Sequence, residues 1–270
     1  MTRQNLLTEP HRWDVTRVAA PGALLAFDFD GTLAPIVASP PDAAMRETTR
    51  VRLTELARRR QVAIITGRAL ADIEPRLRGV PTSAIVGNHG SEPSPYMAAA
   101  RESVAAWLPL LHAAVGHLSG LVIENKGASL AVHYRHASSP EAARAAIAAA
   151  VRRLGDGVRH MEGIEVVNLV PVGAPTKGDA LARLRAECGA SAVFYIGDEE
   201  TDEDAFAVLD DDTSLAVRVG ASDTSRARYF VPSQSDVDAL LDLLLAATEA
   251  YDTVPPDPVG RSAPDRSAAP

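Results

Sequence analysis

The stretch ALLAFDFDGT, residues 23–32, carries the strongest structural signal in this 270-residue chain. It begins with five continuous apolar residues, which predict a strand buried on both faces of a parallel sheet. Asp28 and Asp30 follow at the end of that strand, and Gly31 lets the chain turn sharply. Because side chains alternate along a strand, two carboxylates two residues apart can face the same way. Ligands bind at the carboxyl ends of strands in open α/β sheets, so we expect a functional edge here.

Alternating strands and helices surround this stretch. Strands are predicted at residues 62–65, 84–86, 192–196 and 215–219, and helices at 42–60, 178–187, 202–209 and 236–250. A helix followed by a strand, repeated, indicates βαβ units and a parallel sheet. We therefore predict an α/β fold with a Rossmann-like parallel-sheet core, built from residues 21–92 and 171–250.

A different pattern interrupts this core between residues 93 and 170. Helices are predicted at 98–118 and 140–154, and strands at 121–124, 129–134 and 163–170. The first two strands are joined by the tight turn Asn125-Lys126-Gly127, which indicates a hairpin. This order predicts an inserted α+β domain. Residues 1–20 read as a loose lead-in, and the proline-rich residues 251–270 as a disordered tail.

The bulk composition excludes several classes of protein. The formal net charge is −8, from 35 acidic and 27 basic side chains, whereas a nucleic-acid partner requires a basic face. The single cysteine, Cys188, allows no internal disulfide. No apolar run reaches the roughly 20 residues of a membrane span, and the N-terminal residues do not read as a signal peptide. We expect a cytoplasmic monomer with neither a nucleic-acid nor a membrane partner.

A second acidic cluster follows the predicted strand 192–196. Residues 197–203 read GDEETDE, and their carboxylates would meet Asp28 and Asp30 if the two strands are neighbours. A hard divalent cation such as Mg²⁺ relieves the repulsion between such carboxylates with oxygen ligands. One carboxylate can then attack phosphorus while another shuttles a proton. The alternatives are a solvated acidic turn after residue 27 and a plain helix cap in the second cluster.

Two further positions suit a phosphate group. Residues 66–68 (TGR) close a predicted strand, where a hydroxyl and free backbone N–H groups can reach phosphate oxygens, although such turns are common. Lys177 opens a predicted helix; the helix macrodipole disfavours a cation there, and a bound phosphate would reverse that preference. Lys126 and Lys177 are the two lysines among the 27 basic residues. A lysine where arginine dominates indicates a place for a compact point charge.

In their order along the chain, DxDGT, TGR, KG and GDxxxD resemble the four-motif signature of the haloacid dehalogenase-like (HAD) phosphatases. The resemblance implies a HAD core, with a specificity-bearing α+β cap domain inserted between the second and third motifs. It implies four catalytic residues: Asp28 as nucleophile, Asp30 as general acid/base, and Thr66 and Lys177 as phosphate ligands. It also implies a Mg²⁺ ion held by the Asp28 carboxylate, the Asp30 backbone carbonyl, Asp198 and Asp202.

Longer stretches resemble one branch of that superfamily, the trehalose-6-phosphate phosphatases. They are DFDGTLAPI, IITGR, GNHG, the hairpin ENKG…LAVHYR and GDEETDEDAF, and the match covers residues 21–245. GNHG and ENK…HYR are the most specific. The resemblance implies trehalose 6-phosphate as the substrate and six residues that contact it: Arg68, Asn88, His89, Glu124, Lys126 and Arg135. The GNHG pair would lie at the junction of core and cap, and the last three would reach from the cap toward the sugar.

Two positions depart from the family pattern. Glu199 replaces the second aspartate of GDDxTDE, where its longer side chain could still assist the metal site. Asn168 stands where the family tends to have a glutamate, three residues before Pro171, and Glu165 would lie on the opposite face of a regular strand. One acceptor for a sugar hydroxyl is thereby weakened. The alternatives are a HAD phosphatase for another sugar or cyclitol phosphate, a catalytically silent sugar-phosphate-binding protein, and a phosphomutase, for which the sequence shows no means of returning the phosphate.

Overall fold

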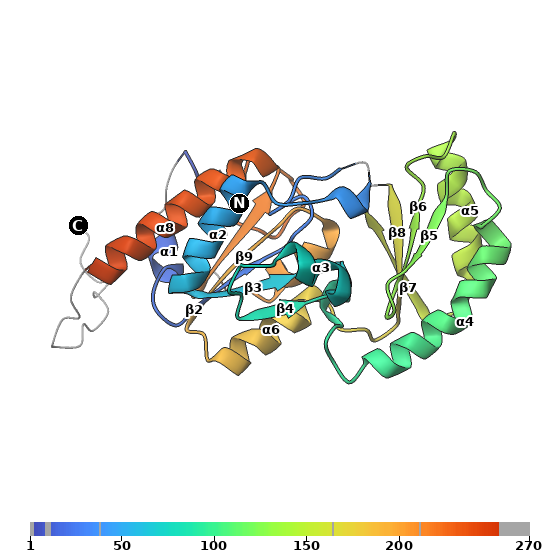
Figure 1. Cartoon of the computed structure of the whole chain (residues 1–270), viewed down its shortest axis with the longest axis horizontal. Helices are drawn as coiled ribbons and strands as arrows, with labels where there is room; N and C mark the ends of the chain where they lie inside the picture. The colour runs from blue at the N-terminus through green and yellow to red at the C-terminus, as the bar shows by residue number, and fades with distance from the viewer. Residues whose placement is uncertain (1–2, 9–11, 38, 164, 211, 254–270) are drawn as a thin grey trace, which may run out of the picture.

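The computed structural model describes residues 3–8, 12–37, 39–163, 165–210 and 212–253. It has two lobes, each built on its own sheet (Figure 1). The larger lobe contains β1 (Gln4–Asn5), β2 (Ala23–Phe27), β3 (Gln61–Ile65), β4 (Ala84–Val86), β9 (Ala192–Gly197), β10 (Ser214–Val219) and β11 (Tyr229–Val231). Their order is β1-β11-β10-β9-β2-β3-β4, and all neighbours run parallel. The predicted parallel-sheet core is confirmed.

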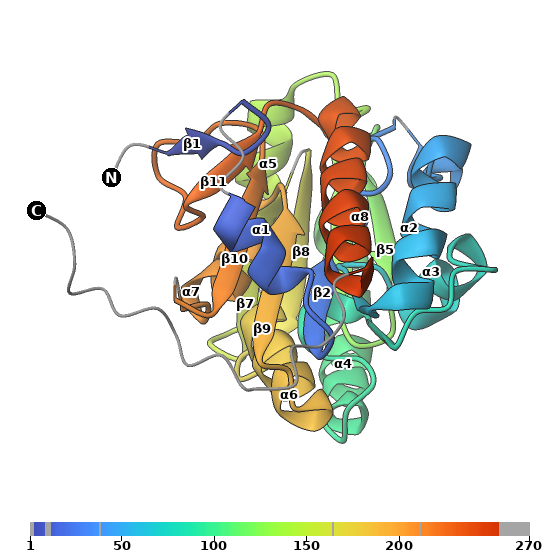
Figure 2. The ribbon, with the colours of Figure 1, turned by 90° about the vertical axis from the view of Figure 1, so that its left-hand side faces the viewer.

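Helices cover both faces of this sheet (Figure 2). One face carries α1 (Arg12–Val18), α2 (Glu47–Arg59), α3 (Leu70–Arg76) and α8 (Val237–Thr253), and the other carries α6 (Lys177–Cys188) and α7 (Glu203–Ala207). The strand β2 shows why both faces must be covered. Ala23, Leu25 and Phe27 pack into the first core, whereas Leu24 and Ala26 pack into the second. A strand that is apolar at every position buries both of its faces in this way.

The smaller lobe, the cap, is an antiparallel sheet with helices on one face. It contains α4 (Met97–Val115), β5 (Val122–Asn125), β6 (Leu130–His133), α5 (Pro140–Arg153), β7 (Val158–Gly163) and β8 (Val166–Pro171), with the strand order β5-β6-β8-β7. Leu130, Val132 and Leu169 pack against α4 and α5. Since side chains alternate, Glu124, His133 and Asn168 lie on the opposite face, which is turned toward the core lobe. The predicted α+β cap is confirmed.

Three predicted elements differ in detail. The strand expected at 163–170 is two strands, β7 and β8, joined by a turn in which Glu165 has a left-handed backbone with φ of 58°. The helix expected from residue 42 begins at Glu47, after a short 3₁₀ turn at Pro40–Asp42. Residues 1–20, expected to be loose, contribute β1 and α1. β1 has only two residues, too few for a periodic signal, and gains its order by pairing with β11.

The C-terminal helix α8 continues three residues beyond its predicted end and reaches Thr253, so the predicted tail begins with helix. The remainder of that predicted tail, residues 254–270, lies outside the described residues. No helix within the described part of the chain is long and apolar enough to cross a membrane.

Candidate active site

Three acidic side chains meet where β2 and β9 end side by side. Asp28, Asp198 and Asp202 each offer a carboxylate oxygen, and these oxygens all lie within 4.8 Å of one another. Gly31 allows the Asp198 carboxylate to approach the turn that follows β2. It has a φ of +73°, and a Cβ atom at this position would lie only 2.0 Å from Asp198 Oδ2. Only glycine tolerates both that backbone and that closeness, so the turn after β2 positions the acidic cluster.

Lys177 completes the cluster from the opposite side. It is the first residue of α6, and its Nζ lies 3.0 Å from Asp28 Oδ1 and 2.8 Å from Asp202 Oδ1. Thr176 caps the helix by accepting a hydrogen bond from the Asp179 backbone N–H. Gly90 of the GNHG stretch packs directly on the start of this helix, since a Cβ there would lie 2.1 Å from the Thr176 carbonyl oxygen. The helix start is thereby fixed against the core.

The charges of this cluster are strongly coupled. Burial raises the pKa of Asp28; Lys177 opposes this rise, and the charges of Asp202 and Asp198 add to it. Burial, followed by repulsion from Asp202 and Glu199, raises the pKa of Asp198 to about 8. Burial disfavours a charge on Lys177, yet Asp202 and Asp28 together raise its pKa. The cluster therefore holds more negative charge than its lysine can offset, so it favours a bound cation.

The set of oxygen ligands fits Mg²⁺. The three carboxylates are hard ligands and are close enough to share one ion. Burial, together with repulsion from the neighbouring carboxylates, raises the pKa of Asp28 and of Asp198. Asp202 is completely buried and already accepts hydrogen bonds from Lys177 and from the Tyr195 hydroxyl, at 2.6 Å. Asp28 and Asp198 are therefore better placed to be direct ligands, with Asp202 holding Lys177 and Tyr195 in position.

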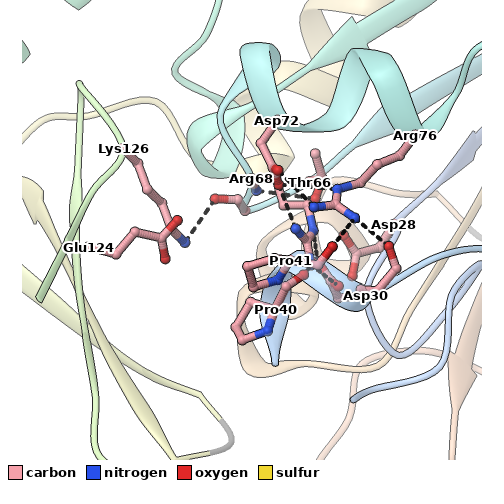
Figure 3. A network of polar contacts seen from close by, with 12 residues as sticks. Asp28, Asp30, Pro40, Pro41, Thr66, Arg68, Asp72, Arg76, Glu124 and Lys126 are labelled. Atoms are coloured by element: carbon pink, nitrogen blue, oxygen red, sulfur yellow. Dashed lines mark hydrogen bonds and ion pairs between the residues drawn. The ribbon is translucent and has the colours of Figure 1, made fainter. Parts of the chain in front are cut away.

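Asp30 lies outside this cluster, in a second network that Figure 3 shows. Arg68 donates two hydrogen bonds, of 2.6 and 2.7 Å, to the Asp30 carboxylate. The same guanidinium pairs with Asp72 on α3, and Asp72 also pairs with Arg76 at 2.9 Å. Arg76 donates to backbone carbonyls of the loop at residues 41–43. This chain of contacts fixes the Asp30 side chain and the loop beside it.

One cavity of about 460 Å³ is lined by both lobes. Asp28, Asp30, Thr66 and Lys177 line it from the core, together with the apolar side chains of Ile36, Val37, Pro40, Pro41 and Ala43. The cap contributes the polar residues Glu124, Lys126, His133, Arg135, Glu165 and Asn168. A cavity of this volume, with apolar walls and a few convergent polar groups, is typical of a small-molecule site.

Lys126 and Arg135 extend from the cap to the core. Lys126 Nζ lies 3.2 Å from the Gly67 carbonyl oxygen and 3.4 Å from Asn168 Oδ1, and it points toward the core lobe in Figure 3. Arg135 donates to the Val37 carbonyl and pairs with Glu165 at 2.7 Å. Both residues therefore line the cavity and also hold the cap against the core.

The GNHG residues divide between two roles. Asn88 does not line the cavity: its amide contacts the Lys126 carbonyl oxygen at 3.2 Å, and its oxygen accepts from Ser129 at 2.7 Å. It joins the core to the cap hairpin. His89 lines the cavity and is 4% exposed; its ring nitrogens make no well-formed hydrogen bond, and Asn168 of the cap is the polar side chain that approaches the ring. Burial and then the charges of Lys126 and Lys177 lower its pKa, so the ring is neutral.

Sequence reasoning missed several lining residues. Glu165 was expected on the face opposite Asn168, but it precedes β8 with a left-handed backbone, so strand alternation does not apply and both residues line the cavity. His133 was not singled out; its Nε2 lies 2.8 Å from Glu124 Oε2. Its position two residues before Arg135 on a strand was the available signal. The Asp72–Arg76 pair, which lies within α3, could have been found as an i,i+4 pair on a helix.

Known proteins with similar sequences include phosphatases, which agrees with the acidic cluster and the cavity described above. The family model for trehalose-phosphatase matches residues 26–235. A trehalose-phosphate phosphatase of Mycobacterium avium is 39% identical over 196 residues, covering 67% of this chain and 49% of that protein. One of Mycobacterium ulcerans is 36% identical over 218 residues, covering 74% and 55%. The chain thus spans about half the length of these relatives.

The fold has a counterpart among solved structures. The C-terminal domain of a trehalose-6-phosphate phosphatase from C. albicans superposes with a TM-score of 0.77 at 22% identity, covering 91% of this chain and 99% of that domain. At this identity the superposition speaks for the fold alone, whereas the family model covers most of the residues that build the cavity. The chain belongs to the trehalose-phosphatase family.

Proposed function

We propose that this protein is a phosphatase that hydrolyses trehalose 6-phosphate to trehalose and phosphate. One observation carries the proposal: the buried pair of Asp28 and Lys177 opens into the same cavity as the polar face of the cap. The core offers a nucleophile beside a phosphate-binding cation. The cap offers fixed donors and acceptors, the groups that recognise sugar hydroxyls. The names of its relatives support the choice of sugar.

In this mechanism Asp28 attacks phosphorus and forms an aspartyl-phosphate, while Asp30 protonates the departing sugar oxygen. Asp30 then takes a proton from the water that hydrolyses the intermediate. Arg68 holds the Asp30 carboxylate in one orientation through its two hydrogen bonds. Lys177 and the Thr66 hydroxyl bind the phosphate oxygens. Throughout the reaction, Asp202 keeps the Lys177 ammonium beside Asp28.

A magnesium ion fits the acidic cluster and would be held by Asp28 and Asp198, to which the family resemblance adds the Asp30 backbone carbonyl as a further ligand. When bound, it would neutralise the charge that otherwise separates the carboxylates from the incoming phosphate.

A second candidate substrate follows from Asn168. Its oxygen accepts from Lys126, and as an amide it is a weaker acceptor for a sugar hydroxyl than a carboxylate. A phosphatase for another sugar or cyclitol phosphate is therefore the competing proposal.

The test is phosphate release by the wild-type protein from trehalose 6-phosphate, glucose 6-phosphate, an inositol phosphate and a small aryl phosphate. We expect kcat/KM for trehalose 6-phosphate to exceed that for glucose 6-phosphate by at least about tenfold, because the smaller sugar leaves polar groups of the cap unpaired. Activity should vanish on chelation and return with Mg²⁺. A preference for another substrate would support the competing proposal, and release from none of the four would refute a phosphatase.

A further inference from the structure

Glu199 stands apart from the other acidic side chains that line the cavity. Five of those side chains have a basic partner: Asp28 with Lys177, Asp30 with Arg68, Asp72 with Arg76, Glu124 with His133 and Glu165 with Arg135. Among the described residues, no basic nitrogen lies within 4.0 Å of the Glu199 carboxylate. The Glu199 side chain accepts from the Asp202 backbone N–H in a capping box, and its remaining acceptor positions are open to a ligand, whereas the other five carboxylates are each paired with a basic side chain.

The Glu199 side chain reaches from the core to the cap. It belongs to the loop after β9, and cap strand β7 packs against the 3₁₀ turn at Glu200–Asp202 that follows it. A Cβ atom on Gly163, the last residue of β7, would lie 3.7 Å from Glu199 Oε1 and 3.7 Å from Asn168 Nδ2. The missing side chain at Gly163 leaves room for the carboxylate. Glu199 and Asn168 thus flank one corner of the cavity, from opposite lobes.

The corner of the cavity between Glu199 and Asn168 suits an uncharged hydrogen-bond donor. A phosphate would be repelled by a carboxylate, and in the proposed mechanism Thr66 and Lys177, which also line the cavity, bind the phosphate instead. A ligand that fills the cavity displaces the water around Glu199, and a desolvated carboxylate then needs a hydrogen-bond donor. Sugar hydroxyls are such donors, and bonds from a donor to an ionised acceptor are about twice as strong as neutral ones.

We propose that Glu199 is a specificity-determining residue whose carboxylate accepts a hydrogen bond from a hydroxyl of the substrate's sugar. The proposal rests on the proposed function, since it assumes a phosphorylated sugar in this cavity. It assigns part of the sugar recognition to the loop after β9 in the core lobe, in addition to Glu124, Lys126 and Arg135, which the sequence predicted to reach the sugar from the cap. It also gives a role to the position at which this chain departs from the family pattern.

The test compares Glu199→Gln with wild type on trehalose 6-phosphate and on a small aryl phosphate, which has no sugar hydroxyls. The amide keeps the shape of the side chain but removes its charge. We expect kcat/KM for trehalose 6-phosphate to fall about tenfold, chiefly through KM, and that for the aryl phosphate to change less than about twofold. Glu200→Gln is the matched control, because Glu200 is exposed, adjacent and outside the cavity. It should leave both values unchanged.

A thermal melt with and without Mg²⁺ separates this role from a role at the metal. Glu199→Gln should keep most of the wild-type gain in Tm on adding saturating Mg²⁺, with only a small decrease because Glu199 repels Asp198. Loss of most of the gain, or an equal loss of kcat/KM on both substrates, would show that Glu199 serves the metal or the phosphate and would overturn the proposal. Unchanged kinetics on both substrates would overturn it as well. If wild type itself ignores trehalose 6-phosphate but cleaves the aryl phosphate, the proposed function fails, and the proposal fails with it before any variant is measured.

Discussion

The proposed chemistry needs Asp28 as an ionised carboxylate, and the surroundings of Asp28 disfavour that charge. It is 3% exposed, and its pKa is raised by burial and by two neighbouring aspartates, with Lys177 acting against that rise. The free energy of holding the carboxylate ionised comes from the rest of the fold. A residue that lowers the stability of the folded protein, at a site where several pKa values are shifted, is typical of a catalytic centre.

We predict that Asp28→Asn abolishes turnover without unfolding the protein. The amide cannot attack phosphorus, and loss of a nucleophile costs several kcal/mol of transition-state stabilisation, so kcat should fall at least about a thousandfold. In chelator, the Tm of the variant should equal or exceed that of wild type, because a repelled buried charge is removed while Lys177 keeps Asp202 as its partner. Phosphate release and thermal melts are the measurements. The control is Asp156→Asn, at an exposed residue of the cap. A variant that retains activity within about tenfold of wild type would exclude Asp28 as the nucleophile.

At the scale of elements, the hairpin formed by β5 and β6 connects the two lobes. Its turn carries Lys126, whose ammonium contacts the carbonyl oxygen of Gly67 in the core. Its backbone is tied to Asn88 of the core through the Lys126 carbonyl and the Ser129 hydroxyl. The hairpin is therefore both a wall of the cavity and a joint between core and cap.

We predict that Lys126→Ala impairs recognition of the sugar more than the chemistry. Loss of a charged donor to hydroxyl groups costs about 1–3 kcal/mol, so kcat/KM for trehalose 6-phosphate should fall roughly ten- to a hundredfold. Hydrolysis of an aryl phosphate should change little, since its transition state is held by the core alone. The matched control is Arg101→Ala, which removes an exposed cation of the cap outside the cavity. An equal loss on the aryl phosphate would mean that Lys126 acts by ordering the loop at residues 66–68.

At the scale of the whole molecule, the acidic cluster should make stability depend on pH and on metal. The pKa of Asp198 rises to about 8 in the folded protein, well above its unfolded value. The folded state then binds the proton more tightly than the unfolded state. Protonation of Asp198 therefore contributes to the free energy of unfolding. That contribution is complete below about pH 4 and is lost as the pH rises toward 8, by up to about 1.4 kcal/mol per pH unit.

We therefore predict that Mg²⁺ raises Tm more at pH 8 than at pH 5. At pH 5 the ion must compete with a proton on the cluster, whereas at pH 8 it relieves repulsion between ionised carboxylates. The measurement is Tm in chelator and in saturating Mg²⁺, at each of the two pH values. Groups that the ion does not contact titrate equally with and without Mg²⁺, so their effect cancels when the two Tm values at one pH are subtracted. An equal gain at both pH values would contradict the metal site at Asp28 and Asp198.

The sequence by itself determined the parallel core, the hairpin and the identity of the chemical groups. These features are local: an apolar run predicts a buried strand, a polar residue after it marks the functional edge, and Gly31 marks a turn that only glycine can make. The two lysines also stood out in the sequence, and both line the cavity. Such signals are contained within a few residues, so they can be read without knowing what lies across the fold.

Only the tertiary structure decided which of these groups act on one another. Arg68 is 38 residues from the Asp30 carboxylate that it holds, and Arg135 is 98 residues from the Val37 carbonyl that it contacts. Asn88 lies at the junction of core and cap, as the sequence predicted, but its side chain contacts the cap hairpin and does not line the cavity. Glu165 reaches the cavity because of a single left-handed residue, and Glu199 reaches the cap because Gly163 leaves room for its carboxylate. These outcomes depend on how segments distant in sequence are placed against each other, within the core and between the two lobes, and no local pattern encodes that placement.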